Sequence, residues 1–239
     1  MALNRIGTVS SAWRYPVKSM GGERLASAEV TLQGISADRM FAYVQATSRS
    51  PFPWLTGREM AAILQYRPEW ETGDGGRPSL FVRTPSGGRF AVGSDELKSE
   101  LERESGREIY FLPNYRGSFD VAAITFMTNA TVNGIAELSQ TPPEPGRFRM
   151  NFYVETGGNR PFQENEWVGK VLRLGDGARV AITEKDKRCA MITLAPHGGA
   201  PVTPVLAAVA RENEAYAGVY GSVLTPGTVN EGDEVFVEV

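Results

Sequence analysis

The sequence of 239 residues contains one cysteine and one histidine. A single cysteine excludes an intramolecular disulfide, an iron–sulfur cluster and a cysteine-rich zinc site, because each of these needs at least two thiols. The single histidine, His197, excludes metal sites built from several histidines and leaves few routes to a Ser/His/Asp arrangement. Chemistry in this protein therefore cannot rest on a cluster of cysteine and histidine side chains.

The sequence also lacks a surplus of positive charge and any long apolar run. It has 25 Lys and Arg against 28 Asp and Glu, a formal charge of −3 and a pI near 5.4. Nucleic-acid binders need basic side chains that displace counterions, so we expect no nucleic-acid partner. The start MALNRIGTVSSAW has no apolar signal core, and no stretch approaches eighteen consecutive apolar residues. We therefore expect no membrane segment and a cytoplasmic location.

The chain is rich in turn formers, with 26 Gly and 15 Pro, which favours short strands over long helices. Alternating, β-branched and aromatic residues predict strands in the first ninety residues. These strands are expected at residues 5–17, 24–32, 39–46, 79–84 and 89–93. The segment 170–184 predicts a hairpin that turns at Asp176–Gly177, and residues 231–239 predict a last strand.

Helix signals are few and short. Thr56 and Glu59 form a capping-box pattern ahead of a short helix that extends to residue 64. A second helix is expected over 94–106, with Ser94 as N-cap and Gly106 at its end. A third is expected over 203–218, with Thr203 as N-cap and Pro204 at the first helical position.

A further helix is expected to follow a buried strand that ends at Thr128. Thr128 would cap it, Val132, Ile135 and Leu138 would line one face, and Pro142–Pro143 would end it. The composition therefore predicts a mainly β, α+β protein with a few short helices. A seam near residues 112–120 divides it into two β-rich halves, 1–115 and 116–239.

The single cysteine, Cys189, follows three cations within four positions: Lys185, Lys187 and Arg188. Nearby positive charge stabilises a thiolate and prepares it to act as a nucleophile or as a ligand for a soft metal. Cysteine is also among the most buried residue types, so a small buried apolar side chain is the alternative. The cations themselves are equally typical of a solvated turn after a strand. Spacing alone leaves these alternatives open.

Three motifs resemble those of the MOSC domain, named for the C-termini of molybdenum-cofactor sulfurases. They are Arg149 with Asn151, the stretch PFQENEWVG at 161–169, and RCAMIT at 188–193. Residues 9–44 resemble the β-barrel domain that precedes MOSC in the amidoxime-reducing component and its bacterial relatives. The resemblance implies an N-terminal β-barrel domain over 1–115 and a MOSC β-barrel domain over 116–239.

In that family the cysteine ligates molybdenum, and the pterin that carries the metal ends in a phosphate. The resemblance therefore implies that Cys189 is the metal ligand and the catalytic residue. Lys18 and Ser19, with Gly21–Gly22 for close backbone approach, would bind the phosphate. The alternative for KSMGG is an exposed turn. The resemblance adds eight further cofactor-binding residues: Arg39, Thr128, Asn129, Thr131, Arg149, Asn151, Arg188 and Tyr220.

Several of these residues have a structural alternative. The hydroxyls at residues 128–131 suit an anion site at a helix start, but they also suit an ordinary cap. In PFQENEWVG, Phe162 and Trp167 are expected to pack while Glu164 and Glu166 face water; Glu164 could instead line a substrate opening. His197 is expected in a loop, with a general-acid role as the alternative.

The resemblance implies an oxidoreductase that uses molybdenum cofactor to reduce N-oxygenated compounds such as hydroxylamines, amidoximes and N-oxides. No cysteine-rich extension follows residue 239, so we expect electrons from a separate ferredoxin-like or cytochrome-b5-like protein with its reductase. One alternative is a sulfur carrier that holds a persulfide on Cys189. Another is a cofactor carrier without turnover. The resemblance also brings a family association with pyridoxal phosphate, although no pyridoxal-dependent sulfur donor domain is present.

Overall fold

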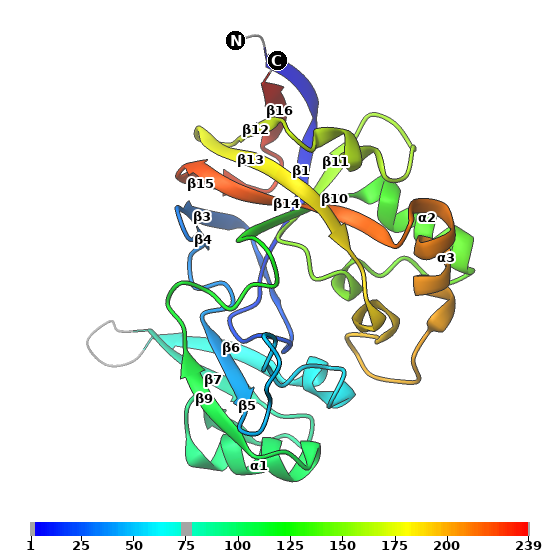
Figure 1. The fold of residues 1–239 in the computed structure, drawn as a ribbon. Coiled ribbons are helices and arrows are strands. Elements are labelled where there is room, and N and C mark those ends of the chain that lie inside the picture. The colour runs from blue at the N-terminus through cyan, green and yellow to red at the C-terminus, as the bar shows by residue number, and fades with distance from the viewer. Residues whose placement is uncertain (1–2, 73–77, 239) are drawn as a thin grey trace.

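The computed structural model describes residues 3–72 and 78–238. It has two bodies, a β-barrel that carries both termini and a smaller module below it (Figure 1). Only three α-helices occur among the described residues, which confirms the mainly β prediction. In the same part of the chain, no helix is both long and apolar enough to cross a membrane.

The barrel is a sheet of seven strands that closes on itself. Its order is β11-β10-β14-β13-β12-β16-β1, and a further pairing between β1 and β11 completes the ring. The strands are β1 (Leu3–Arg14), β10 (Ile124–Thr128), β11 (Phe152–Thr156), β12 (Val171–Leu174), β13 (Ala178–Lys187), β14 (Tyr216–Thr225) and β16 (Glu234–Glu238). Because side chains alternate along each strand, one set from every strand fills the barrel. Phe126 and Phe152 stack within this core, with ring centroids 5.4 Å apart.

Shorter strands extend the barrel. β2 (Glu23–Leu25) pairs with β1, and a small sheet has the order β15-β3-β4. This sheet consists of β3 (Ser27–Thr31), β4 (Gly34–Ile35) and β15 (Gly227–Asn230). The predicted hairpin is confirmed: β12 pairs with β13 from Leu174 opposite Ala178, and Gly177 has a φ of 83° in the loop. A positive φ explains why glycine follows Asp176.

The smaller module is built from residues between β4 and β10. It contains β5 (Phe41–Gln45), β6 (Arg67–Thr72), β7 (Pro78–Arg83), β8 (Arg89–Ala91), β9 (Ile109–Pro113) and α1 (Asp95–Ser105). Helix α1 begins and ends as predicted: the Ser94 side chain accepts from Leu97 N, and Gly106 has a φ of 65°. Because β1 to β4 lie with the barrel, the module is an insertion into it. The seam near 112–120 marks only the second crossing of the chain between the two bodies.

Two helices pack on the outside of the barrel, α2 (Asn129–Ser139) and α3 (Thr203–Asn213) (Figure 1). Thr128 caps α2 as predicted, since its Oγ1 accepts from Thr131 N at 3.1 Å. The prediction for Leu138 is wrong: Val132 and Ile135 are buried, whereas Leu138 is exposed. On a helix of 3.6 residues per turn, Ala136 and Ser139 complete the buried face instead.

Two other helix predictions need correction. The capping-box contact exists, because Thr56 N and Oγ1 both donate to Glu59 Oε2, at 2.9 and 2.8 Å. The chain nevertheless forms a turn there, followed by the 3-10 helix η1 (Ala61–Gln65). In α3, Thr203 is the first helical residue rather than the cap, and the cap position is held by Val202 without a side-chain bond. Pro204 lies second in that helix, where a missing N–H costs nothing.

Candidate functional site

A cavity of about 560 Å³ opens where loops of the barrel and of the smaller module meet. Its lining comes from distant parts of the sequence, including residues 18–19, 50–58, 119–122, 147–149 and 184–192. Met191 and Leu194 pack against the core of the smaller module, so the segment after Cys189 joins the two bodies. The cavity therefore depends on both bodies for its walls.

Cys189 lines this cavity at the point where β13 leaves the barrel. It immediately precedes the 3-10 helix η4 (Ala190–Thr193), and its carbonyl accepts from Ile192 N at 3.2 Å. The residue is exposed. The alternative that Cys189 is a small buried apolar side chain is therefore wrong for this structure, and the thiol is open to a ligand.

The cavity is cationic although the chain as a whole is acidic. Eight Lys and Arg residues line it against three Asp and Glu, which gives a formal balance of +5. The cations are Lys18, Arg39, Arg58, Arg147, Arg149, Lys185, Lys187 and Arg188, and the acids are Asp120, Glu184 and Asp186. A hollow lined by one sign of charge concentrates ligands of the opposite sign. This cavity therefore favours an anionic group.

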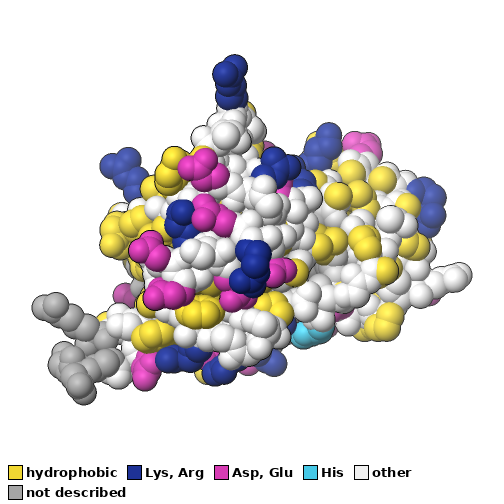
Figure 2. All heavy atoms as spheres, turned by 90° about the horizontal axis from the view of Figure 1, so that it is seen from below, with side chains coloured by type: hydrophobic (Ala, Val, Ile, Leu, Met, Phe, Trp, Pro, Cys, Tyr) yellow, Lys and Arg dark blue, Asp and Glu magenta, His cyan; other side chains and the backbone are white. Residues whose placement is uncertain are grey.

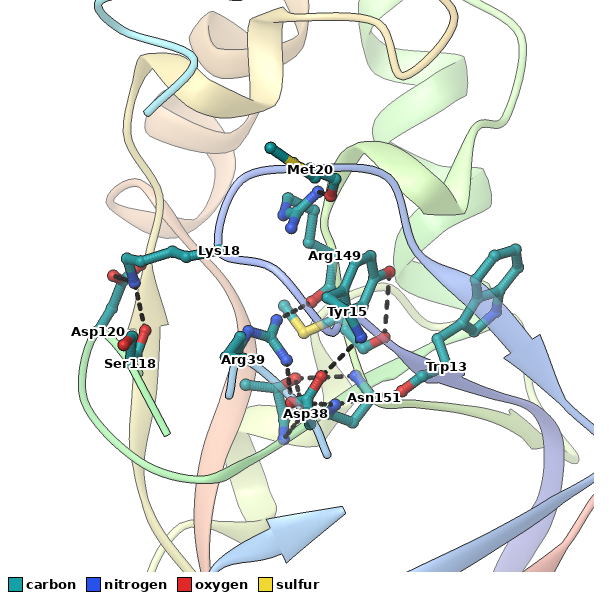
Figure 3. Close-up of polar contacts among 12 residues, drawn as sticks. Trp13, Tyr15, Lys18, Met20, Asp38, Arg39, Ser118, Asp120, Arg149 and Asn151 are labelled. Carbon is teal, nitrogen blue, oxygen red and sulfur yellow. Dashed lines mark hydrogen bonds and ion pairs between the residues drawn. The ribbon is translucent and has the colours of Figure 1, made fainter. Parts of the chain in front are cut away.

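Lys18 is almost completely buried at one side of the cavity (Figure 3). Its Nζ donates to Ser118 O and to Asp120 Oδ1, both at 2.6 Å. Burial lowers the pKa of Lys18, and the Asp120 carboxylate opposes that shift. Lys18 itself lowers the pKa of Asp120, against the effect of that residue's burial. Lys18 thus lies at the cavity wall with one exposed acidic partner, Asp120.

Arg39 and Arg149 lie together in the centre of the site (Figure 3). Arg39 pairs with Asp38 through Nη1, and its Nη2 donates to Arg149 O at 2.8 Å. Arg149 Nη1 donates to Met20 O at 2.7 Å. Burial lowers the pKa of Arg149 to about 10, while Tyr15 and Asp38 oppose that effect. Both guanidiniums therefore remain cations near neutral pH.

Arg188, next to the thiol, is a third guanidinium of the site, and its side chain is only 9% exposed. Its Nη1 pairs with Asp186, and its Nη2 donates to Phe148 O at 2.8 Å. Its Nε is buried and has no hydrogen-bond partner among the described residues. Buried donors are nearly always satisfied in native proteins, so an orphan donor here points to a missing acceptor. Burial raises the pKa of Asp186, and Arg188 opposes that shift.

Left-handed backbone conformations accumulate at the site. Eight described non-glycine residues have a positive φ, and three of them, Ser19, Arg39 and Arg149, line the cavity at φ values of 68°, 48° and 57°. Such conformations are costly for residues with a Cβ and tend to occur at functional sites. Here they turn two arginine side chains toward the cavity.

Four predicted cofactor-binding residues lie outside the cavity lining. Thr128 and Thr131 are fully buried, and their hydroxyls donate to Glu164 Oε2 at 3.0 and 2.7 Å. Asn129 donates from Nδ2 to Glu155 at 2.7 Å. Asn151 is fully buried and bonds Thr125, Trp13 and Asp38. The start of α2 therefore already holds a carboxylate of the chain itself, and Asn151 acts as an internal connector.

The prediction that Glu164 faces water is wrong. Its carboxylate is fully buried and accepts from Thr128, Thr131 and Gly218 N, the last at 3.2 Å. Burial raises the pKa of Glu164, and its hydrogen-bond donors partly oppose this. Trp167 packs and Glu166 is exposed, both as expected. Glu164 thus joins the 3-10 helix η3 (Gln163–Trp167) to α2 and β14, and it does not line the cavity.

The glycines of KSMGG serve internal packing. A Cβ at Gly21 would lie 2.6 Å from Arg67 Nη1, and one at Gly22 would lie 2.4 Å from Tyr15 Cε1. Close approach to side chains of the protein therefore accounts for both glycines, and their role in backbone approach to a phosphate stays a prediction. Ser19 and Tyr220 do line the cavity.

His197 is exposed, beside Arg67, and does not line the cavity. The chain's one histidine is visible at the surface in Figure 2, on a face where basic and acidic side chains are interspersed. This placement agrees with the prediction of a loop residue and gives no support to a general-acid role.

Sequence reasoning did not identify five residues that shape the site: Tyr15, Asp38, Asp120, Arg147 and Asp186. Arg147 is buried and donates from Nη1 to Ile192 O at 3.0 Å. The RFRM segment did place a second arginine near Arg149, and that proximity was the available signal. The aspartates Asp38, Asp120 and Asp186 had no comparable signal in their spacing, because an aspartate in a loop has the same sequence context whether it is solvated or paired.

A metal ion held by the protein alone needs several ligating side chains close together. Across residues 3–72 and 78–238, no group of three or more His, Cys, Asp and Glu side chains could hold a metal ion. The protein can therefore offer one thiolate to a metal that arrives with ligands of its own. A cationic lining and an orphan guanidinium donor suit an anionic carrier of such a metal. The residues present thus fit an anionic metal cofactor.

The fold and the cavity define a β-barrel protein with an inserted β module and a cationic, thiol-bearing site between them. The family model of the MOSC domain matches residues 116–236, and that of the MOSC N-terminal beta barrel domain matches residues 6–104. The chain belongs to the MOSC-domain family, as its motifs indicated. The matched family descriptions give no support to an association with pyridoxal phosphate.

A solved structure that aligns over nearly the whole chain shares this fold. The YuaD protein from Bacillus subtilis is 14% identical, and the alignment covers 99% of this chain and 98% of that one with a TM-score of 0.53. YiiM from Geobacillus stearothermophilus is 19% identical over 49% of this chain and 54% of its own, with a TM-score of 0.39. No curated protein matches this chain.

Proposed function

We propose that this protein binds molybdenum cofactor in the cavity, with Cys189 as the protein ligand of the metal, and reduces N-oxygenated compounds. Hydroxylamines, amidoximes and N-oxides are the substrate class. The observation that carries the proposal is the convergence of the chain's single thiol with cations from distant segments, the buried Lys18 and the partly buried Arg39, Arg149 and Arg188. Membership of the MOSC family supports the choice of cofactor.

The cations would hold the anionic end of the cofactor. A guanidinium binds phosphate through paired N–H groups, and Lys18 adds a point charge. An acceptor at Arg188 Nε would satisfy the donor that has no partner among the described residues. Thr128, Asn129, Thr131 and Asn151 would act indirectly, through the packing that they hold in place.

When bound, the cofactor supplies the two-electron chemistry that removes oxygen from nitrogen. The protein supplies a thiolate at Cys189, whose neighbour Arg188 is a fixed positive charge. It also supplies walls from both bodies that limit the approach of the substrate. We propose a separate electron donor, a ferredoxin-like or cytochrome-b5-like protein with its reductase, and a cytoplasmic setting.

A sulfur carrier is the second candidate function. The exposure of Cys189 favours it, because a persulfide must be accessible to the protein that receives the sulfur. The partly buried Arg39 and Arg149, which line the cavity, would have no role in such transfer. The third candidate, a cofactor carrier without turnover, shares every feature of the site with the reductase.

Turnover separates these candidates. Protein from a host that makes molybdenum cofactor is mixed with a hydroxylamine or an amidoxime and a chemically reduced viologen, and the amine or amidine product is quantified. The proposal predicts product in proportion to bound molybdenum and none from Cys189→Ser. Bound molybdenum without product identifies a carrier. Persulfide on Cys189 in protein that lacks molybdenum identifies a sulfur carrier.

A further inference from the structure

One aromatic ring lies between the two central arginines of the site (Figure 3). The Cζ of Arg39 lies 4.8 Å from the centroid of the Tyr15 ring, and the Cζ of Arg149 lies 4.4 Å from it. Guanidiniums within about 6 Å of an aromatic centroid are attracted by the negative face of the ring. Tyr15 follows β1 directly and is buried. Both arginines line the cavity, whereas the ring is not among the described residues that do.

The ring is itself fixed on several sides. The backbone N of Tyr15 donates to Asp38 Oδ1 at 2.7 Å, and its hydroxyl donates to Met150 O at 3.4 Å. Gly22 packs against the ring so closely that a Cβ there would lie 2.4 Å from Cε1 and 2.6 Å from Cδ1. The ring therefore has little freedom to tilt or to move away from the arginines.

The same contacts orient the arginines. Asp38 binds both the Tyr15 backbone and Arg39, and it also accepts from Asn151 Nδ2 at 3.0 Å. Arg39 in turn donates to the backbone carbonyl of Arg149. Two buried like charges repel each other, and a long guanidinium side chain loses much rotamer freedom when it is ordered. The aromatic face opposes the repulsion and limits the rotamers of both side chains.

We propose that Tyr15 is a positioning residue whose ring holds Arg39 and Arg149 ready to bind an anion in the cavity. The identity of the anion, the phosphate end of molybdenum cofactor, rests on the proposed function. The dependence of the two arginines on the ring does not rest on it. The same proposal gives Gly22 a role, because only a residue without a Cβ lets the Tyr15 ring lie where it does. Tyr15 acts through the arginines and makes no contact with the ligand.

The test uses inorganic pyrophosphate as the probe and calorimetric titration at low ionic strength. Tyr15→Phe keeps the ring and is expected to bind within about twofold of wild type. Tyr15→Leu removes the ring, and Gly22→Ala displaces it; both are expected to bind at least about tenfold more weakly. Tyr43→Leu is the matched control. Tyr43 is equally buried and packs on Phe111 in the smaller module, so its loss should lower Tm and leave pyrophosphate affinity unchanged.

A double-mutant cycle distinguishes positioning from a general loss of structure. If the ring acts through the arginines, Tyr15→Leu weakens binding in the wild-type background but adds little to Arg149→Gln. Additive losses in the cycle would overturn the proposal. Wild-type affinity in Tyr15→Leu would also overturn it, as would a wild type that does not bind pyrophosphate. A loss of affinity that merely follows the loss of Tm in both Tyr15→Leu and Tyr43→Leu would overturn it too. If Tyr15→Leu does not fold, Gly22→Ala in the same cycle decides, because it displaces the ring without removing it.

Molybdenum and pterin content, measured on the same proteins, separates the two proposals. Pyrophosphate binding that depends on Tyr15 in a protein without pterin would leave the positioning role intact and contradict the proposed cofactor. Pterin retained equally by wild type, Tyr15→Leu and Gly22→Ala would support the cofactor and overturn the positioning role.

Discussion

Removal of the Glu164 side chain is expected to destabilise the protein strongly, whereas removal of Glu166 is not. The two residues lie two positions apart in the same 3-10 helix, and the sequence suggests the same role for both. Glu164 is fully buried and accepts from two threonine hydroxyls and from Gly218 N. Glu166 is exposed and pairs with the equally exposed Arg160. They therefore form a matched pair of variants.

The magnitude follows from the groups that Glu164→Ala leaves behind. Gly218 N loses its acceptor, and the two hydroxyls can then donate only to each other, at 3.0 Å, although they still accept from Thr131 N and Phe162 N. A buried donor left without a partner costs about 1–3 kcal/mol, so the lost bonds together should cost about 2–4 kcal/mol of unfolding free energy. Relief of the buried charge reduces that figure without cancelling it, because three donors already compensate the carboxylate. For Glu166→Ala the unfolding curve should coincide with that of wild type.

Urea unfolding at neutral pH, followed by tryptophan fluorescence, measures both variants. Glu164→Gln adds a test of charge. Because burial raises the pKa of Glu164 above its unfolded value, its protonation favours the folded state. This contribution is complete below the unfolded pKa of about 4.3 and is lost as pH rises through the folded pKa. The stability of wild type relative to Glu164→Gln should therefore decrease as pH rises above about 4. Equal losses in Glu164→Ala and Glu166→Ala, or a relative stability that increases with pH, would refute this reasoning.

Two further predictions concern α2 and Lys18. Ile135→Ala should lower the unfolding free energy by about 2–4 kcal/mol and Leu138→Ala by under about 1 kcal/mol, because only Ile135 is buried. Similar urea midpoints for the two variants would contradict this prediction. Pyrophosphate affinity should fall with rising pH before an ordinary lysine would lose its proton, because burial lowers the pKa of Lys18. Asp120→Asn removes the carboxylate that opposes this shift, so calorimetric titration should show the fall at lower pH; an unchanged profile would count against the role of this ion pair.

Local features of the fold were predictable from sequence because their causes are local. Ser94 and Gly106 bound α1, Thr128 caps α2, and Asp176–Gly177 lies in the loop of a hairpin, each through contacts within a few residues. Strand pairing was not predictable in the same way. The alternation in residues 5–17 indicates a strand, but only the tertiary structure shows that β1 closes a barrel with β11 and β16.

The site was predictable only in part. Charge near Cys189 identified a plausible thiolate, and the MOSC resemblance added Lys18, Arg39, Arg149 and Arg188, which the structure places around one cavity. No spacing rule joins residues so far apart in sequence.

The roles of Glu164 and Gly22 were not predicted, for a related reason. Glu164 is buried because hydroxyls from α2 reach it, and Gly22 is required because Tyr15 lies against it. Both causes are contacts between distant segments. A carboxylate and a glycine in turn-rich sequence give no sign of such partners.

The central claim is that Cys189 ligates the metal of a bound molybdenum cofactor. Its most direct test is the molybdenum and pterin content of protein purified from a cofactor-competent host, beside Cys189→Ser prepared in the same way. The account predicts near-equimolar molybdenum and pterin in wild type and a sharp loss of molybdenum in the variant. Well-folded wild-type protein with neither molybdenum nor pterin would contradict it.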